Sequence, residues 1–577
     1  MRGLLAQAHH TYDQFSEGSR ALFLFFAALC VLSSVSLLYL LNESLLVAVP
    51  AYGGSLSEGV IGSPRFINPV LAVSDSDHDL TSLVYSGLLR ATPGGDYTPD
   101  LAQSYTVSPD GKTYTFTIRP NATFHNGTPV TADDVVFTVG KTQDATLKSP
   151  LKANWDGVTV AAIDAHTVQF TLKQPYAPFV ENLTMGILPK SLWQNVSDDE
   201  FSFSNLNTSP VGSGPFVVTN ISRSASGIPT SYELTPFNKY ALGAPYISDL
   251  TLQFYQNEAA VVAALKNGDI QAASGISPAN VASLWGSTVV KAPLNRVFGV
   301  FFNQNQSTVL RDHDVRQALE DAVDRNALLT QVLGGYGTAL AGPVPPSLIG
   351  SSASTSAVLA PASGADLALA AQQELLKKGW VLTNGVLTKT TGKGKNVSTV
   401  TLQFSLATDN VPELRASAEY LKEVWGKMGA KVDVQIYDQG DLSQNVIRPR
   451  KYDALLFGEV IGRELDLFAF WDSSQRNDPG LNIALYANST ADKILEQLRT
   501  TSDDSQRSVL YGKFEDQLNA DIPAIFLYAP DFVYIVPKQL AGLNLGLIET
   551  PSDRFLSVTD WHLETDSVWP MFVKQRR

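Results

Sequence analysis

The sequence predicts an α/β protein with more than one domain, preceded by one long apolar helix. Its 577 residues are too many for a single hydrophobic core. Beyond residue 57, segments with the two-residue period of strands alternate with amphipathic helical segments as far as the C-terminus, and no internal repeat interrupts them. The run from Ala21 to Leu41 carries no charged residue and supplies the helix at the start.

The run from Ala21 to Leu41 has the length of a membrane span. Its 21 residues would extend roughly 30 Å as an α-helix, which is the thickness of the hydrocarbon core of a bilayer. The run is longer than the apolar part of a usual secretory signal, so we expect an uncleaved transmembrane anchor. Residues 1–20 are then cytoplasmic, because arginines lie on that side of the run. Residues 42–57 are expected to be a linker.

Cys30 is the only cysteine of the chain and lies in the middle of the apolar run. Lipidation there would require a small preceding residue, whereas the preceding residue is Leu29. A removed signal peptide, cleaved near residues 49–51, is the alternative to an anchor, and Pro50 disfavours cleavage at that point. The rest of the chain has no cysteine, so it has no disulfide, thiol nucleophile or cysteine metal site.

The sequence argues against two kinds of partner, nucleic acid and a bound metal ion. A net charge of −14 and the lack of a basic stripe argue against nucleic acid. Asp75, Asp77 and Asp79 have the alternate spacing of a calcium loop, but Leu80 replaces its glycine and no glutamate closes it. We therefore expect no metal, and we expect Asp79 to cap a helix.

Several elements follow from local patterns. Asp110-Gly111 is a turn dipeptide, so the strand that contains Tyr105 should form a hairpin with the strand over 113–118. Thr131 with Asp134 three residues later predicts the start of a helix. Other expected elements are a helix over 315–329 capped by Asp312 or Asp314, a helix over 412–428, and a strand over 430–436.

A series of motifs carries a family resemblance. In order, the first are YSGL (85–88), PDLA (99–102), SPDG (108–111), FHNG (124–127) and TADDV (131–135). They resemble the defining block of the family 5 extracellular solute-binding proteins, which are the peptide-binding receptors of ABC importers. Matching landmarks continue along the chain, including GPF (214–216), NKY (238–240), LKNGDI (265–270), VRQAL (315–319) and IPAI (522–525).

This resemblance implies a two-lobed, type II periplasmic-binding-protein-like fold with an extra subdomain. Lobe I would comprise residues 58–293 together with 530–577, and its subdomain would cover about 80–205. Lobe II would comprise residues 300–521. Two extended segments, near 293–303 and 522–530, would connect the lobes.

The resemblance also implies a function. Receptors of this family bind a solute between two hinged lobes outside the membrane and do not alter it. We therefore expect a single-pass receptor in the cell membrane with its C-terminal domain extracytoplasmic. It would bind peptides or similar small solutes, without a cofactor or catalytic residues, and deliver them to the permease and ATPase subunits of an ABC importer. The ectodomain is expected to be monomeric.

Two segments match the positions that line the ligand cleft of peptide-binding relatives. The expected site residues in the first segment are Val73, Ser74 and Asp75, and those in the second are Gly458, Glu459, Val460, Ile461 and Gly462. The main-chain groups of Gly458 and Val460 are expected to pair with an extended peptide as an added strand would.

The second segment departs from the family pattern. Peptide receptors place an aspartate, which binds the α-amino group of the peptide, at the position of Gly462, and usually a tryptophan at the position of Glu459. Glu459, Glu464 or Asp466 could replace that aspartate, or these acids could be solvated loop charges. Peptide is therefore the leading ligand class, beside sugars, siderophore-like chelates and other small solutes.

Two other functions remain open at the level of sequence. A membrane-anchored hydrolase lacks local support, because the chain has no His-Glu-x-x-His helix and no Gly-x-Ser-x-Gly elbow. A sensor or folding helper could retain the same scaffold without transport. Copurification of permease and ATPase subunits would distinguish transport from those roles.

Overall fold

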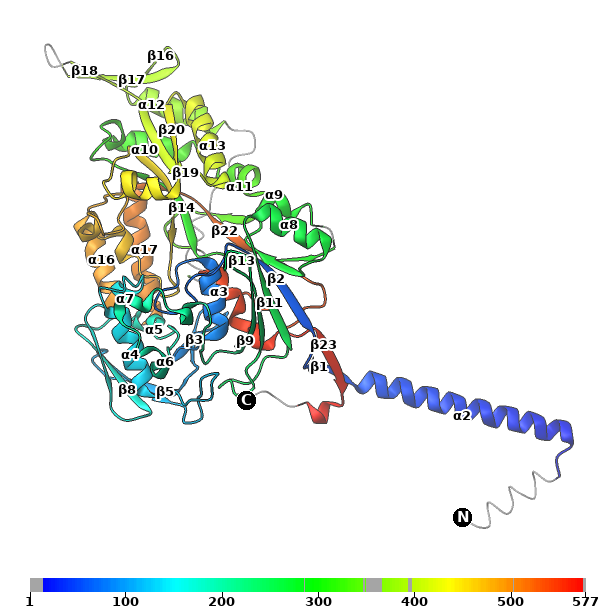
Figure 1. Cartoon of the computed structure of the whole chain (residues 1–577). Coiled ribbons are helices and arrows are strands. Elements are labelled where there is room, and N and C mark those ends of the chain that lie inside the picture. The colour runs from blue at the N-terminus through cyan, green and yellow to red at the C-terminus, as the bar shows by residue number, and fades with distance from the viewer. Residues whose placement is uncertain are drawn as a thin grey trace.

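One long apolar helix precedes the folded part of the chain. The computed structural model describes residues 14–284, 286–345, 348, 366–392, 397–501 and 503–573, so residues 1–13 of the expected cytoplasmic segment lie outside it. Helix α2 (Glu17–Leu45) contains the whole run 21–41 and buries no side chain. It projects away from the rest of the molecule (Figure 1). Among the described residues it is the one helix long and apolar enough to cross a membrane, a test that a signal sequence also passes.

A mixed sheet runs through both lobes. Its strands, in spatial order, are β20 (Lys431–Tyr437), β19 (Gln403–Asp409), β21 (Ala454–Val460), β14 (Arg296–Phe302), β22 (Ala524–Val536), β12 (Ala272–Ser274), β2 (Ser55–Ile61), β11 (Asp249–Tyr255), β10 (Pro229–Pro236) and β9 (Phe216–Arg223). Two further strands, β13 (Thr288–Pro293) and β15 (Gly337–Ala339), also pair with β22.

Strand β22 joins the two halves of this sheet. Its first residues pair with β14 and β15, and its last residues pair with β13 and β12. Only Leu294 and Asn295 separate β13 from β14, so the chain crosses between the halves there as well. Two adjacent extended segments therefore connect the two halves of the sheet, with β14, β19 and β20 above and β2, β9 and β11 below in Figure 1.

The chain also forms smaller sheets. A four-stranded sheet in the first half of the chain has the order β5 (Ala102–Val107), β6 (Thr113–Ile118), β8 (Thr167–Leu172) and β7 (Val158–Ala162). The remaining sheets pair β3 (Leu89–Ala91) with β4 (Tyr97–Pro99), and β17 (Val386–Thr391) with β16 (Val381–Thr383) and β18 (Ser398–Thr401).

Helices cover these sheets. The α-helices are α3 (Asp75–Val84), α4 (Ala132–Gln143), α5 (Phe179–Asn182), α6 (Lys190–Trp193), α7 (Asp198–Phe201), α8 (Glu258–Asn267), α9 (Pro278–Val281), α10 (His313–Asp321), α11 (Arg325–Leu333), α12 (Leu367–Lys377), α13 (Pro412–Met428), α14 (Gln439–Asp441), α15 (Phe468–Trp471), α16 (Ser489–Thr500) and α17 (Asp504–Asp521). Helices of other types are η1 (Lys152–Trp155), η2 (Asn205–Asn207), η3 (Val309–Arg311), η5 (Leu442–Ile447), η6 (Ser473–Gln475), η7 (Pro551–Asp560) and η8 (Pro570–Phe572).

The segment 42–57 differs from the expected linker. It contains the end of α2, the strand β1 (Val47–Ala51) and the start of β2. Strand β1 pairs antiparallel with β23 (Glu564–Val568), which belongs to the C-terminal end of the chain. This connection is therefore part of a two-stranded sheet. Sequence patterns do not reveal such main-chain pairing between segments that are far apart in the chain.

Most local predictions are confirmed. The hairpin pairs Tyr105 with Phe116 across β5 and β6. Thr131 begins α4, and its N–H donates to the Asp134 carboxylate at 2.9 Å. The helix expected over 315–329 is instead two helices, α10 and α11, because Asp324 caps the second one.

The expected role of Asp79 is wrong. Ser74 caps α3, and Asp77 completes the capping box, so Asp79 lies inside the helix. The Asp79 carboxylate instead accepts two hydrogen bonds of 2.7 Å from the guanidinium of Arg554, which also binds Glu58. This buried group ties α3 and β2 to η7 near the C-terminus, and removal of one partner would leave an uncompensated buried charge.

Candidate functional site

The C-terminal end of β21 carries the second predicted segment at the boundary between the lobes. Strand β21 pairs antiparallel with β14, so Glu459 is opposite Val297 and Gly458 is opposite Phe298. Side chains alternate between the two faces of a strand. Ala454 and Leu456 pack in one buried cluster, while Leu455 and Ile461 pack in another on the opposite face. Glu459 therefore shares the face of Ile461, and Val460 is on the other face.

The main-chain groups of Gly458 and Val460 face away from β14. Ile461 N–H donates to Asn295 O and Asn303 N–H donates to Asp453 O, which fixes odd-numbered residues of β21 as the ones bonded to β14. On the opposite edge, the pairing of β21 with β19 ends at Leu456. Among the described strands, none pairs with that edge beyond Leu456, so it has the form of an open edge that an extended chain could join.

Glu459 is buried and has no hydrogen-bond partner among the described residues. Its exposed fraction is 3%, and both carboxyl oxygens lack a partner. Burial raises the pKa of this carboxyl well above its usual range. A neutral acid in an apolar layer makes a poor anchor for an ammonium group. Glu459 also does not line either cavity described below.

A carboxyl group from another segment lies beside Gly462. A Cβ added to Gly462 would lie 3.3 Å from both carboxyl oxygens of Glu181, a residue of α5. The main-chain groups of Arg463 and Glu464 lower the pKa of this carboxyl group and so oppose the rise that burial causes. The carboxyl group of Glu181 thus lies next to the space that a side chain at position 462 would enter.

Glu181 belongs to a group of charged side chains in which three acids, Glu181, Glu549 and Asp553, accompany one arginine, Arg463. Arg463 Nη2 donates to Asp553 Oδ2 at 2.5 Å, and Arg463 Nε lies 3.8 Å from Glu549 Oε2. Burial raises the pKa of Glu549 well above its ordinary range, and the nearby Glu181 charge raises it further. Burial raises the pKa of Glu181 as well, but less far, because the neighbouring Glu549 and Arg463 oppose the rise, so Glu181 is the more acidic member of this coupled pair.

A cavity of about 1040 Å³ opens between the extra subdomain and the residues after β21. Ligand sites usually have about 300–1,000 Å³, so this volume suits a small solute or short peptide. Of the predicted site residues, Val460 and Gly462 line it. The opposite wall consists of Trp155, Tyr176, Phe179, Glu181 and their neighbours in the subdomain.

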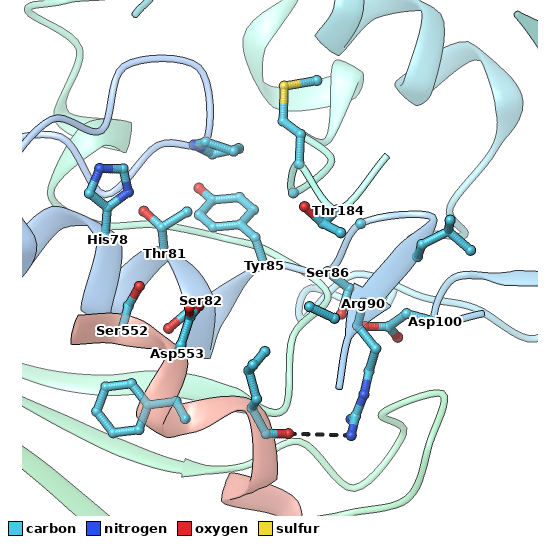
Figure 2. A pocket seen from close by; sticks show the side chains of 18 of the residues that line it. His78, Thr81, Ser82, Tyr85, Ser86, Arg90, Asp100, Thr184, Ser552 and Asp553 are labelled. Atoms are coloured by element: carbon cyan, nitrogen blue, oxygen red, sulfur yellow. Dashed lines mark hydrogen bonds between the residues drawn. The ribbon is translucent and has the colours of Figure 1, made fainter. Parts of the chain in front are cut away.

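A second cavity of about 320 Å³ adjoins the first. The two share the lining residues Leu151, Glu181, Thr184, Met185 and Glu549. Figure 2 shows Thr81 and Ser82 of α3 on one side of the smaller cavity and Ser552 and Asp553 of η7 facing them. Arg90, in the lower part of the view, donates a hydrogen bond of 3.3 Å to the carbonyl oxygen of Leu556.

The first predicted segment lies at the start of α3, outside both cavities. Val73 is 64% exposed, Ser74 is the N-cap, and Asp75 is in the first turn. Their neighbours Ala72 and His78 line the smaller cavity. The structure thus brings Val460 and Gly462 to the larger cavity, and it does not bring Val73, Ser74, Asp75, Gly458, Glu459 or Ile461 to the lining of either one.

Asp466, another acid considered from the sequence, lines the larger cavity but is already engaged. Tyr176 donates to its Oδ2 at 3.0 Å, and Arg499 Nε lies 3.1 Å from the same oxygen. The Arg499 guanidinium also stacks over the Tyr176 and Phe468 rings, at 4.9 and 4.4 Å from their centroids. These contacts link the subdomain, which contains Tyr176, to the opposite wall of the cavity.

The sequence did not reveal Glu181, Arg463 or Glu549 as site residues. Arg463 directly follows the predicted segment, so a search one residue further would have included it. Glu181 and Glu549 lie far from Gly462 along the chain, and only the folded arrangement brings their carboxyl groups together.

Comparison with known proteins gives the family. Residues 96–478 match the model of the bacterial extracellular solute-binding proteins, family 5. The oligopeptide-binding protein AppA of Bacillus subtilis is 28% identical over 532 residues, which are 89% of this chain and 92% of AppA.

Solved structures agree with this match. AppA of Bacillus subtilis in complex with a nonapeptide has a TM-score of 0.68 at 26% identity, over 89% of this chain and 100% of that structure. The ABC transporter substrate-binding protein CtaP of Listeria monocytogenes has a TM-score of 0.73 at 25% identity, with the same coverage. These neighbours are two-lobed binding proteins, and the family comprises receptors and not enzymes. Since the family match covers more than half of the 577 residues, this chain belongs to the family 5 bacterial extracellular solute-binding proteins.

Proposed function

We propose that this protein is a membrane-anchored extracytoplasmic receptor that binds peptides between two hinged lobes and delivers them to an ABC importer. The similarity to AppA, whose structure holds a nonapeptide, supports a peptide as the ligand. The roomy cavity of about 1040 Å³ beside the open edge of β21 is the observation that carries this proposal. Permease and ATPase subunits are the proposed partners of the closed, loaded receptor.

The proposed lobes follow the two halves of the central sheet. Lobe I is residues 58–293 with 530–577, including the subdomain 80–205, and lobe II is residues 300–521. The change of strand partners along β22, from β14 to β13, supports a hinge near Pro530. A ligand that contacts both lobes would favour the closed state by the contacts that only this state offers.

We propose that the peptide main chain pairs with Gly458 and Val460. Their N–H and C=O groups point to an edge without a described partner strand, which supports β-strand addition. Val73, Ser74 and Asp75 are proposed to contact the ligand from lobe I when the lobes close. Side chains of the peptide would occupy the larger cavity, where water can accommodate varied sequences.

We propose that Glu181 is the anchor for the peptide α-amino group. Its carboxyl group lies beside Gly462 and is the more acidic of the Glu181–Glu549 pair, whereas burial disfavours the charged form of Glu459 and Asp466 is held by Arg499. Glu181 lines both cavities at the wall that they share, which supports its role as an anchor.

The proposed anchor is α2, which would remain uncleaved. Its exposed apolar surface and the direct connection of α2 to the paired strand β1 support a permanent attachment. Tethering would raise the concentration of the receptor near its permease, as linking of two modules does. Mass spectrometry of the mature protein from membranes should detect residues 14–45; a mature N-terminus near residue 51 would contradict the anchor.

Ligand identity provides the direct test of the function. Native mass spectrometry of the full-length protein, released from purified membranes in mild detergent, should detect copurified peptides of unchanged mass. Addition of an unlabelled peptide mixture should displace them. Recovery of hydrolysed peptides, or failure of every peptide pool to bind, would contradict the proposal.

A further inference from the structure

The C-terminal segment after β23 exposes a cluster of apolar side chains. The exposed fractions of Trp569, Met571, Phe572 and Val573 are 38, 77, 67 and 41%. Within the segment, Pro570 begins the short helix η8. A soluble protein seldom exposes a tryptophan, a methionine and a phenylalanine within four residues unless a partner covers them.

Strand pairing places this segment at the base of α2. Val568, the last residue of β23, is the register partner of Val47, which follows the end of α2 at Leu45 by two residues. Because β1 leads away from α2 and β23 is antiparallel to β1, β23 leads back toward the helix. Figure 1 shows η8 beside the point where α2 leaves the folded part.

The level of this segment relative to a bilayer follows from helix geometry. If the run 21–41 fills the hydrocarbon core, residues 42–45 extend about 6 Å further along the helix axis. The interfacial layer on each side of the core is about 5–8 Å thick. Val47 and its partner Val568 then lie at the outer edge of the headgroups, and β23 directs Trp569 toward them.

The chemistry of the segment suits the bilayer interface. Tryptophan is enriched at the level of the headgroups, where its ring has an apolar body and a polar N–H. Methionine and phenylalanine contribute apolar surface that can enter the boundary with the acyl chains. The sequence then continues with Lys574, Arg576 and Arg577, which match anionic headgroups in a chain whose net charge is −14.

We propose that residues 569–573 dock on the outer surface of the same bilayer that α2 spans. This inference rests on the membrane-anchored receptor proposed above and adds a second attachment to it. One helix alone would let the ectodomain rotate about its connection. Two contacts joined by the β1–β23 pair would fix the face that the ectodomain turns toward the membrane and therefore toward a permease.

Spin labels on the full-length protein in nanodiscs of phosphatidylcholine and phosphatidylglycerol test the inference. One label replaces Met571 (Met571→Cys) in a Cys30→Ser background. A matched control carries Phe203→Cys in the same background, since Phe203 is 87% exposed and follows α7, on the side opposite α2 in Figure 1. A third sample carries the label on native Cys30 in α2.

Collision of each label with a water-soluble nickel complex and with oxygen reports its environment. We expect the Met571 label to be several-fold less accessible to nickel and more accessible to oxygen than the Phe203 label. Equal accessibility of both labels, with the Cys30 label shielded, would overturn the second contact and leave the α2 anchor intact. A Cys30 label that nickel reaches freely would overturn the anchor and with it this inference.

Discussion

At the scale of single residues, the proposed role of Glu181 beside Gly462 predicts which end of a peptide the site recognises. We expect Glu181→Gln to weaken binding of peptides with a free amino terminus by about 10- to 100-fold, since a hydrogen bond to a charged group contributes about 1.5–3 kcal/mol. N-acetylated peptides should bind the variant and the unaltered protein equally. Calorimetric titration with matched pairs of free and acetylated peptides measures both effects.

Glu200→Gln is a suitable control because Glu200 is an exposed acid of α7 in the same subdomain. It changes the net charge equally without changing the cavity. If Glu181→Gln and Glu200→Gln have the same affinity for a free peptide, Glu181 is not the amine anchor.

The partly buried His125 predicts that the stability of the subdomain depends on pH. His125 Nε2 lies 3.1 Å from Gly214 O, and its Nδ1 accepts from Gly212 N–H at 3.4 Å. Burial lowers the pKa of His125 to about 4. An unfolded histidine has a pKa of about 6.5, so between these values the unfolded chain binds more protons. Stability is therefore lost as the pH falls from 6.5 toward 4.

We expect the difference in unfolding free energy between the unaltered protein and His125→Gln to shrink by roughly 3 kcal/mol between pH 7 and pH 4. Urea unfolding at several pH values measures this difference. Asp100, whose pKa burial raises to about 6, has the opposite effect, with stability lost as the pH rises through 6. The contribution of Asp100 is common to both proteins and cancels in the comparison. A difference in unfolding free energy that stays constant with pH would contradict the lowered pKa of His125.

At the scale of elements, the two edges of β21 have different roles. Val460→Pro removes a main-chain donor from the open edge and no bond to β14. We expect a folded variant whose peptide affinity falls by about 3- to 10-fold, the usual contribution of one hydrogen bond. Fluorescence titration with a labelled peptide, together with thermal unfolding, separates binding from stability.

Ile461→Pro provides the contrast. It removes the N–H that donates to Asn295 O at 2.9 Å, so we expect a loss of about 1–3 kcal/mol of stability. A folded Val460→Pro protein with unchanged affinity would mean that the peptide pairs elsewhere.

Elements that depend on neighbouring residues could be predicted from the sequence. The β5–β6 hairpin and the start of α4 follow from a turn dipeptide and a capping box, both of which act within a few residues. The role of Asp79 could not, because the Arg554 that binds it comes from the other end of the chain. The cap itself is visible in the sequence, because Ser74 with Asp77 three residues later has the spacing of a capping box.

The site could be predicted only where it follows the family pattern. The resemblance located the segment after β21, and two of its residues line the larger cavity. It could not locate Glu181, because tertiary packing brings α5 to Gly462. Nor could it show that Glu459 is buried, which depends on the face that β21 turns toward the core.

At the scale of the whole molecule, a few contacts hold the extra subdomain against lobe II. Ala177 N–H donates to Arg499 O at 3.3 Å, and the Tyr176 ring lies under the Arg499 guanidinium. Arg463 also hydrogen-bonds Asp553 and the carbonyl oxygen of Leu547, which belong to the C-terminal part of the proposed lobe I and not to the subdomain. Under the proposed closure of the lobes, such contacts would stabilise the closed arrangement before any ligand binds and would set how much of the binding energy closure consumes.

Arg499→Ala should therefore shift the ligand-free protein toward the open arrangement. It removes two ring contacts and the ion pair with Asp466, which together contribute about 1–2 kcal/mol. We expect a larger radius of gyration without peptide, the unaltered value with saturating peptide, and an affinity about 5- to 30-fold lower. Small-angle X-ray scattering with and without peptide measures the change. Lys377→Ala, which removes an exposed ion pair within α12, is the control, and identical scattering by both variants would show that these contacts do not govern closure.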